Sequence, residues 1–222
     1  MTLDKQYGYM FDEDYVPSTL GVVAYARWRK DPKTLLFQLS RYKFVAQMLK
    51  GMNDCAEVGC GDGWSSNIVG REVKNLLLTD YDKEFVEEAR KICKLDKRDN
   101  ARCEVHNMLD GPFSTKKDGI YALDVLEHIE PQDEDKFIGS IVKSLRKGGV
   151  CIFGMPTLIS QELIAKEKRD PGHINCKTEK QLRSTMSKHF ETIFTFNMND
   201  ECIFTGNGDL AYYVFAVGIN VN

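Results

Sequence analysis

After residue 50, apolar and polar positions follow two alternating patterns along the chain. Short continuous apolar runs, typical of strands buried on both faces, are each followed by a stretch in which apolar residues recur at helical spacing. The expected strands are residues 55–58, 76–79, 102–106, 119–123 and 150–155, of which 102–106 has the weakest pattern. This alternation of strand and helix predicts a mostly parallel sheet with helices on both faces.

Four helices are expected in the same region. The clearest is residues 83–93, whose apolar side chains share one helical face at Phe85, Val86, Ala89, Ile92 and Cys93. Residues 133–145 carry a similar apolar stripe, and the sequence Lys147-Gly148-Gly149 predicts a glycine-terminated end for that helix. Residues 64–71 and 178–188 are the other two helical stretches.

The two ends of the chain differ from this middle part. Residues 191–196 and 210–217 are β-rich and flank a turn at 206–208, which predicts an antiparallel hairpin at the end of the sheet. The first 50 residues contain no strand-like run and are rich in aromatic side chains, which indicates a helical cap. We expect one α/β domain over 1–222: a cap at 1–50, a doubly wound core at 51–222, and a cap insertion at about 158–176.

Composition and charge exclude several classes of function. The 222 residues carry 33 acidic and 30 basic side chains, a net charge of −3, so a nucleic-acid partner is not expected. No apolar run approaches the ~20 residues of a membrane span, and the polar, acidic start does not resemble a signal peptide. The seven cysteines form no CxxC pair, which is typical of a reduced, cytoplasmic protein.

A glycine-rich segment between the first strand and the first core helix is the strongest functional signal. It reads Glu57-Val-Gly59-Cys60-Gly61-Asp62-Gly63. Glycines at this position let the backbone turn tightly and approach a ligand at the carboxyl edge of the sheet. The spacing G-x-G-x-G differs from the dinucleotide fingerprint G-x-G-x-x-G, which argues against an NAD-dependent oxidoreductase.

Together with further motifs in order, this segment resembles the class I S-adenosylmethionine-dependent methyltransferases, in their small-molecule branch. Asp80 ends the second strand, His106-Asn107-Met108 ends the third, and Asp124-Val-Leu-Glu127-His128 ends the fourth. The resemblance implies a seven-stranded sheet whose last strand is antiparallel, with S-adenosylmethionine as the cofactor. It implies cofactor contacts from Arg41, Glu57, Gly59, Cys60, Gly61, Gly63, Asp80, Tyr81, Asn107, Met108, Asp124 and Val125.

Several of these residues have a second interpretation. Asp80 is assigned to the ribose hydroxyls because a carboxylate accepts two hydrogen bonds, and Asp82 is assigned to the start of the next helix. Asn107 is either a turn residue or an adenine contact. Arg41 is either a surface charge or a bidentate partner of the methionine carboxylate. Glu57 is expected to accept hydrogen bonds from the cofactor or from N–H groups of the loop.

His128 and His173 are the candidate catalytic residues. Imidazole removes protons near neutral pH, and both residues are expected on connections at the carboxyl edge of the sheet. His173 belongs to the segment 158–176, which is longer than a connection between a strand and a helix requires. The alternative for each histidine is a capping or supporting role.

These observations predict methyl transfer from S-adenosylmethionine to an oxygen or nitrogen of a small molecule, without a metal. Basic clusters at 27–30 and 166–169 would favour an anionic acceptor, such as a phosphorylated or nucleotide-linked sugar, if both face the site. The alternatives are a methyltransferase-like scaffold without catalysis and an enzyme that acts on a macromolecule. The aromatic cap is equally compatible with a homodimer surface.

Overall fold

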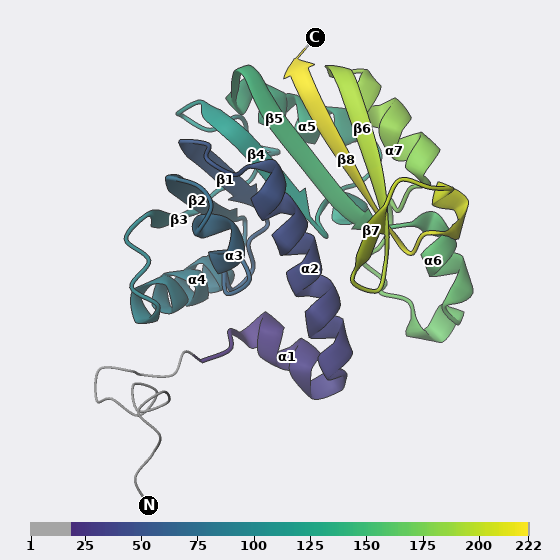
Figure 1. The fold of residues 1–222 in the computed structure, drawn as a ribbon, viewed down its shortest axis with the longest axis horizontal. Helices are drawn as coiled ribbons and strands as arrows, with labels where there is room; N and C mark the ends of the chain where they lie inside the picture. The colour runs from purple at the N-terminus through teal and green to yellow at the C-terminus, as the bar shows by residue number, and fades with distance from the viewer. Residues whose placement is uncertain (1–18, 222) are drawn as a thin grey trace, which may run out of the picture.

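A mixed sheet of eight strands runs through the protein in the order β3-β2-β1-β4-β5-β8-β6-β7 (Figure 1). A computed structural model describes residues 19–221, so Tyr7, Tyr9, Phe11 and Tyr15 of the expected cap lie outside the described residues. The strands are β1 (Asp54–Val58), β2 (Asn75–Asp80), β3 (Ala101–Val105), β4 (Lys117–Leu123), β5 (Leu145–Pro156), β6 (Phe190–Asn199), β7 (Cys202–Phe204) and β8 (Tyr213–Val221).

The first five strands are parallel to one another, and the last three are antiparallel to their neighbours. Strand β8 lies between β5 and β6 and pairs with both in antiparallel register. This arrangement confirms the predicted mostly parallel sheet with an antiparallel pair at its end. The short strand β7, which pairs with the end of β6, was not expected from the sequence and makes the sheet one strand wider than seven.

Helices cover both faces of the sheet, as a doubly wound fold requires. The helices are α1 (Val22–Lys30), α2 (Pro32–Met48), α3 (Asn67–Gly70), α4 (Lys83–Leu95), α5 (Glu134–Ser144), α6 (Leu158–Leu163) and α7 (Glu179–Ser187). Side chains of α2, α3 and α4 belong to one hydrophobic cluster and those of α5 and α7 to the other. Neighbouring strand residues alternate between the clusters: Leu77 belongs to one, while Leu76 and Leu78 belong to the other.

One predicted helix boundary and one predicted helix cap are wrong. The helix expected at 64–71 is reduced to α3, because Arg98 donates to the carbonyls of Gly63 and Trp64 and holds that stretch as turns. The helix expected at 133–145 does end near its predicted position, but not through a glycine cap. Leu145 already pairs with β4, and Gly148 adopts φ +77° inside β5.

Helix α1, the start of α2 and an insertion lie at the carboxyl edge of the parallel strands, and the rest of α2 runs over one face of the sheet. Helices α1 and α2 are the described part of the predicted N-terminal cap, and α1 follows directly on Gly21 (Figure 1). The segment after β5 contains α6, a short turn of 3-10 helix at Lys166–Lys168, and a loop that returns to the sheet at the bridge between Thr157 and Lys177. Within residues 19–221, no helix combines the length and apolar character that a bilayer crossing requires.

Candidate active site

The glycine loop follows β1 and bends because its three glycines adopt left-handed conformations. Gly59, Gly61 and Gly63 have φ values of +76°, +53° and +66°, a region that side chains with a Cβ rarely occupy. A Cβ added to Gly59 would lie 2.3 Å from Cγ2 of Val125, so the loop and the end of β4 are in direct contact. This close approach explains why the sequence needs glycine there.

Asp80, at the end of β2, fixes the middle of the loop. One carboxylate oxygen accepts a hydrogen bond from the N–H of Gly61 at 3.0 Å, and the other accepts from the N–H of Asp82 at 3.0 Å. Asp82 caps α4 by accepting from the N–H of Glu84 at 2.7 Å, which confirms its predicted role. The loop and the acid are therefore one unit, while contact of Asp80 with a ribose stays a prediction.

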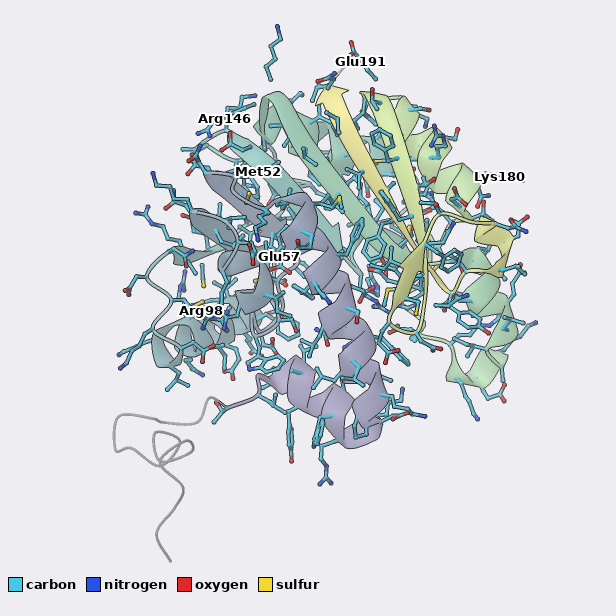
Figure 2. All side chains as sticks on the ribbon, viewed as in Figure 1. Met52, Glu57, Arg98, Arg146, Lys180 and Glu191 are labelled. Atoms are coloured by element: carbon cyan, nitrogen blue, oxygen red, sulfur yellow. The ribbon has the colours of Figure 1, made fainter. Side chains whose placement is uncertain are left out.

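Glu57 lies beneath the loop in the interior, between α2 and the sheet (Figure 2). Its carboxylate accepts hydrogen bonds from the hydroxyls of Tyr42, Tyr121 and Ser66. Burial raises the pKa of Glu57 to about 7, although the three hydroxyls oppose that shift. Its observed partners are side-chain hydroxyls and not N–H groups of the loop, so the structure places it as an internal support.

A contact that the sequence analysis missed joins the loop to the cap. Oδ2 of Asp62 accepts hydrogen bonds from the N–H groups of Val23 and Ala24 at 2.7 and 3.1 Å. These N–H groups belong to the first turn of α1, where a helix leaves its donors without partners. Asp62 therefore caps a helix that lies 38 and 39 residues earlier in the chain. The one feature of the sequence that could have pointed to this role is the position of Asp62 inside the glycine motif.

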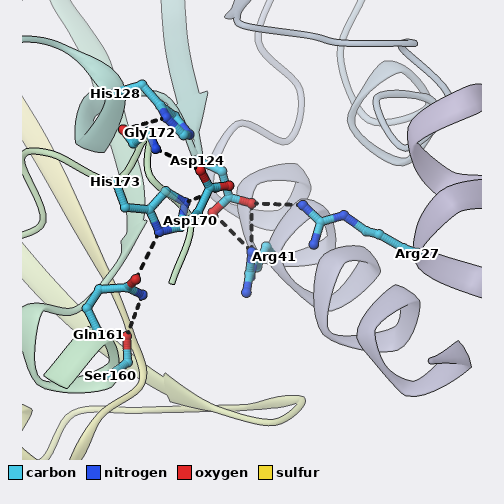
Figure 3. A network of polar contacts seen from close by, with 9 residues as sticks. All are labelled: Arg27, Arg41, Asp124, His128, Ser160, Gln161, Asp170, Gly172 and His173. Carbon is cyan, nitrogen blue, oxygen red and sulfur yellow. Dashed lines mark hydrogen bonds and ion pairs between the residues drawn. The ribbon is translucent and has the colours of Figure 1, made fainter. Parts of the chain in front are cut away.

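Asp124 and Arg41 form the next part of the site, where β4 ends (Figure 3). Nη1 of Arg41 lies 2.7 and 3.0 Å from the two carboxylate oxygens of Asp124, and its guanidinium carbon lies 3.9 Å from the ring centre of Tyr213. Burial is the largest single influence and lowers the pKa of Arg41, but Asp124, Tyr213 and Glu127 together raise it more, and the net shift is upward. Arg41 is therefore not a surface charge: its partner here is Asp124, and its contact with the methionine carboxylate stays a prediction.

His128 and His173 are brought together, as their predicted positions require. Their ring centres lie 5.0 Å apart, and Figure 3 shows both next to Asp124 and Asp170. His128 belongs to the short 3-10 turn Leu126–His128 after β4, and His173 belongs to the segment after α6. Burial, followed by the proximity of His128, lowers the pKa of His173. Both imidazoles thus lie at the carboxyl edge of the sheet.

The remaining predicted contacts are spread along the same edge. Cys60 is buried, and burial raises the pKa of its thiol. Asn107 accepts from the N–H of Leu109 at 2.9 Å and is thus a turn residue, and Met108 is buried. Tyr81 is 76% exposed. Contacts of Cys60, Tyr81, Asn107, Met108 and Val125 with a cofactor remain predictions.

The two basic clusters differ in their relation to the site. In the cluster at 27–30, Arg27 lies 3.6 Å from Asp124. In the cluster at 166–169, Arg169 donates hydrogen bonds to the carbonyls of Glu162 and Ile164 within its own segment.

A cavity of about 710 Å³ lies away from the glycine loop, at the amino ends of β1 and β2, where Asp54 and Asn75 line it.

The glycine loop, Asp80 and the order of strands define a class I S-adenosylmethionine-dependent methyltransferase domain. Residues 56–149 match the family described as "Methyltransferase domain", which agrees with this class. The family assignment confirms the predicted cofactor, S-adenosylmethionine, and disagrees with an NAD-dependent oxidoreductase.

Known proteins agree with this assignment. The chain is 27% identical over 139 residues to the mitochondrial ubiquinone biosynthesis O-methyltransferase of Schizosaccharomyces pombe, a match of 59% of this chain and 48% of the relative. The chain thus spans about half the length of that curated relative.

Two solved structures share the fold. An S-adenosylmethionine-dependent methyltransferase from Clostridium acetobutylicum has a TM-score of 0.68 at 12% identity, over 90% of this chain and 98% of that one. Magnesium protoporphyrin IX methyltransferase from Synechocystis, with bound SAH, has a TM-score of 0.66 at 16% identity, over 90% of this chain and 95% of that one.

Proposed function

We propose that this protein transfers a methyl group from S-adenosylmethionine to an oxygen or nitrogen of a small molecule, and that the acceptor binds beside His128 and His173. The observation that carries the proposal is the pair of imidazoles at the carboxyl edge of the sheet, 5.0 Å apart. In a doubly wound fold this edge is where ligands bind, so the pair lies on the same side as the glycine loop. The name of the Schizosaccharomyces pombe relative, an O-methyltransferase, favours oxygen as the accepting atom.

Methyl transfer to a hydroxyl has two requirements that the protein must meet. Attack on the sulfonium methyl group requires the accepting atom to be aligned with it, and an acceptor hydroxyl must also lose a proton. His173 is held largely neutral because burial and His128 lower its pKa, so it is able to accept a proton. A positioned imidazole contributes about 10²–10⁴-fold to such a step.

The charges near the site support an acceptor with a negative group. The last turn of α1 carries Arg27, Arg29 and Lys30, and Asp124 contacts only the first of these. Lys30 lies three residues after Arg27 and so on the same side of α1, where it adds positive charge to attract an anion. A phosphorylated or nucleotide-linked sugar fits this requirement and also offers hydroxyl groups.

A panel of acceptors tests the proposal. The full chain is incubated with S-adenosylmethionine and sugar nucleotides, phosphorylated metabolites or small amines, and S-adenosylhomocysteine formation is followed by mass spectrometry. We expect product with an anionic hydroxyl compound, and a loss above a hundredfold in His128→Ala or His173→Ala with cofactor affinity retained. His189→Ala is the control, because His189 is paired with Asp135 on α5. Turnover only with a protein or RNA, or cofactor binding with no turnover at all, would contradict the proposal.

A further inference from the structure

We propose that Glu127, His128 and His173 bind one divalent metal ion, although the sequence analysis expected none. One possible ligand atom from each residue lies within 4.8 Å of the others. Ligand atoms that share an ion tetrahedrally at about 2.1 Å are about 3.4 Å apart, so the side chains must approach one another by up to about 1.4 Å, which small rotations of the two imidazoles and of Glu127 supply. Glu127 and His128 come from the turn after β4, and His173 comes from the loop after α6.

The two histidines present the same nitrogen to the site. Nδ1 of His128 lies 2.9 Å from the carbonyl oxygen of Gly172, and Nδ1 of His173 lies 3.1 Å from Oε1 of Gln161. Both partners only accept hydrogen bonds, so each neutral ring carries its proton on Nδ1 and has its lone pair on Nε2. Metal-binding histidines typically donate their other N–H to a carbonyl or carboxylate in this way.

The supports of the two rings are themselves fixed. Asp170 accepts from the N–H of Gly172 at 2.8 Å, and the side-chain amide of Gln161 donates to Ser160 at 3.4 Å, an orientation that turns Oε1 of Gln161 toward His173 (Figure 3). Oδ2 of Asp170 is 3.9 Å from Nε2 of His173, too far for a hydrogen bond. The Nε2 atoms are therefore oriented before any ligand binds.

Glu127 supplies the second, independent observation. Its side chain is fully buried, and neither carboxylate oxygen has a hydrogen-bond partner among the described residues. Its backbone carbonyl accepts from the N–H groups of Ile174 and Asn175, so the backbone of the turn is held against the loop that carries His173. A buried carboxyl group without a partner is costly, and a bound cation would satisfy both of its oxygens.

The surrounding charges are compatible with a cation. Asp124 and Asp170 place two further carboxylates near the cluster, and Arg41 and Arg27 both lie beside Asp124. Arg41 is held by Asp124 through Nη1 and thereby contributes little net charge together with that partner. The carboxylate of Asp170 then leaves a negative charge beside the two imidazoles, and a bound cation would favour the ionised form of Glu127.

The ligand set indicates which ions bind. Two imidazole nitrogens and one carboxylate suit Mn²⁺, Fe²⁺, Co²⁺ or Zn²⁺ better than Ca²⁺, which takes oxygen ligands. Three protein ligands leave coordination positions open for water or for an acceptor oxygen. In that arrangement both Nε2 lone pairs would be bound to the ion, so the ion, by lowering the pKa of a coordinated hydroxyl, would replace the free imidazole that serves as the base in the proposed function. Metal binding itself does not rest on the proposed function.

Calorimetric titration tests the site directly. The full chain, with any affinity tag removed, is treated with a chelator, exchanged into plain buffer and titrated with Mn²⁺, Co²⁺ and Zn²⁺. We expect one ion per chain, and at least tenfold weaker binding in Glu127→Gln and in His173→Ala. His106→Ala is the matched control, because His106 contacts Gly111 and Phe113 elsewhere in the fold, and it should bind like the parent. The proposal is wrong if no ion binds saturably, or if both site variants bind like the parent.

A measurement on the unaltered chain covers the case in which a variant does not fold. X-ray absorption of the Co²⁺-loaded protein should show two imidazole ligands, and their absence would overturn the site. Methyl transfer is assayed separately with and without the chelator. An ion bound through two imidazoles in a protein that methylates no small molecule would overturn the proposed function and leave the metal site standing. Turnover of a small molecule without any imidazole-bound ion would overturn the metal site and leave the proposed function standing.

Discussion

The carboxylate of Asp80 accepts a hydrogen bond from the backbone N–H of Gly61 at 3.0 Å. This bond joins the end of β2 to the middle of the glycine loop that follows β1, two strands that are neighbours in the sheet. The acid and the loop are thus held in a fixed relation within the protein itself. A change at Asp80 should therefore also change the conformation of the loop at Gly61.

Replacing Asp80 should therefore damage cofactor binding. Asp80→Ala removes the anchor of Gly61 and the carboxylate predicted to bind the ribose, and a hydrogen bond to a charged group contributes about 1.5–3 kcal/mol. We expect at least tenfold weaker binding of S-adenosylhomocysteine by calorimetry. Asp82→Ala is the control: it removes the cap of α4, lowers the melting temperature and leaves the affinity near that of the parent. Equal affinities in Asp80→Ala and the parent would refute the assignment.

The conformation of Gly61 leads to a second prediction. Its φ of +53° strains any residue with a Cβ, so Gly61→Ala should lose stability and also distort the loop beside the cofactor. Gly51→Ala is a matched control, because Gly51 has φ +81° and an added Cβ there would contact nothing within 4 Å. Both variants should unfold at lower temperature, while only Gly61→Ala loses affinity for S-adenosylhomocysteine in calorimetry. Similar affinities in the two variants would show that the loop tolerates the side chain.

The sequence predicted the core better than the contacts of the site. Strands β1, β2 and β4 were predictable because their apolar runs are continuous and end in Glu57-Val58, Asp80 and Asp124. The partners of those acids were not predictable, since Tyr42, Tyr121 and Arg41 lie 15, 64 and 83 residues away from the acids that they contact. The pairs with Tyr42 and Arg41 depend on how α2 packs against the sheet, and the pair with Tyr121 depends on the register of β1 and β4. No local pattern encodes either.

The distant cap formed by Asp62 gives a third prediction. In Asp62→Ala the N–H groups of Val23 and Ala24 lose their acceptor, and loss of a cap costs about 0.5–2 kcal/mol. Hydrogen exchange should become about tenfold faster at these two amides. Asp31→Ala is the control, because Asp31 accepts a hydrogen bond from the N–H of Lys33. It should speed hydrogen exchange only at the start of α2. Unchanged exchange at Val23 and Ala24 in Asp62→Ala would show that other contacts hold α1.

The buried carboxyl of Glu57 makes stability depend on pH. Its pKa of about 7 in the folded protein is higher than its ordinary value of 4.5, so the folded state binds this proton more tightly than the unfolded chain. The contribution of the group is complete below pH 4.5 and is lost as the pH rises to about 7, a change of about 3 kcal/mol.

Glu57→Gln isolates this effect because glutamine has a similar shape and does not titrate. The free energy of unfolding, measured in urea between pH 4.5 and 8, should fall with pH more steeply in the parent than in Glu57→Gln. Subtracting the two curves removes the other titrating groups that both proteins share. The amide also loses part of the hydrogen bonding with Tyr42, Tyr121 and Ser66, which offsets the whole curve but not its slope. Parallel curves would mean that the three hydroxyls keep Glu57 ionised over this range, with a pKa near its ordinary value.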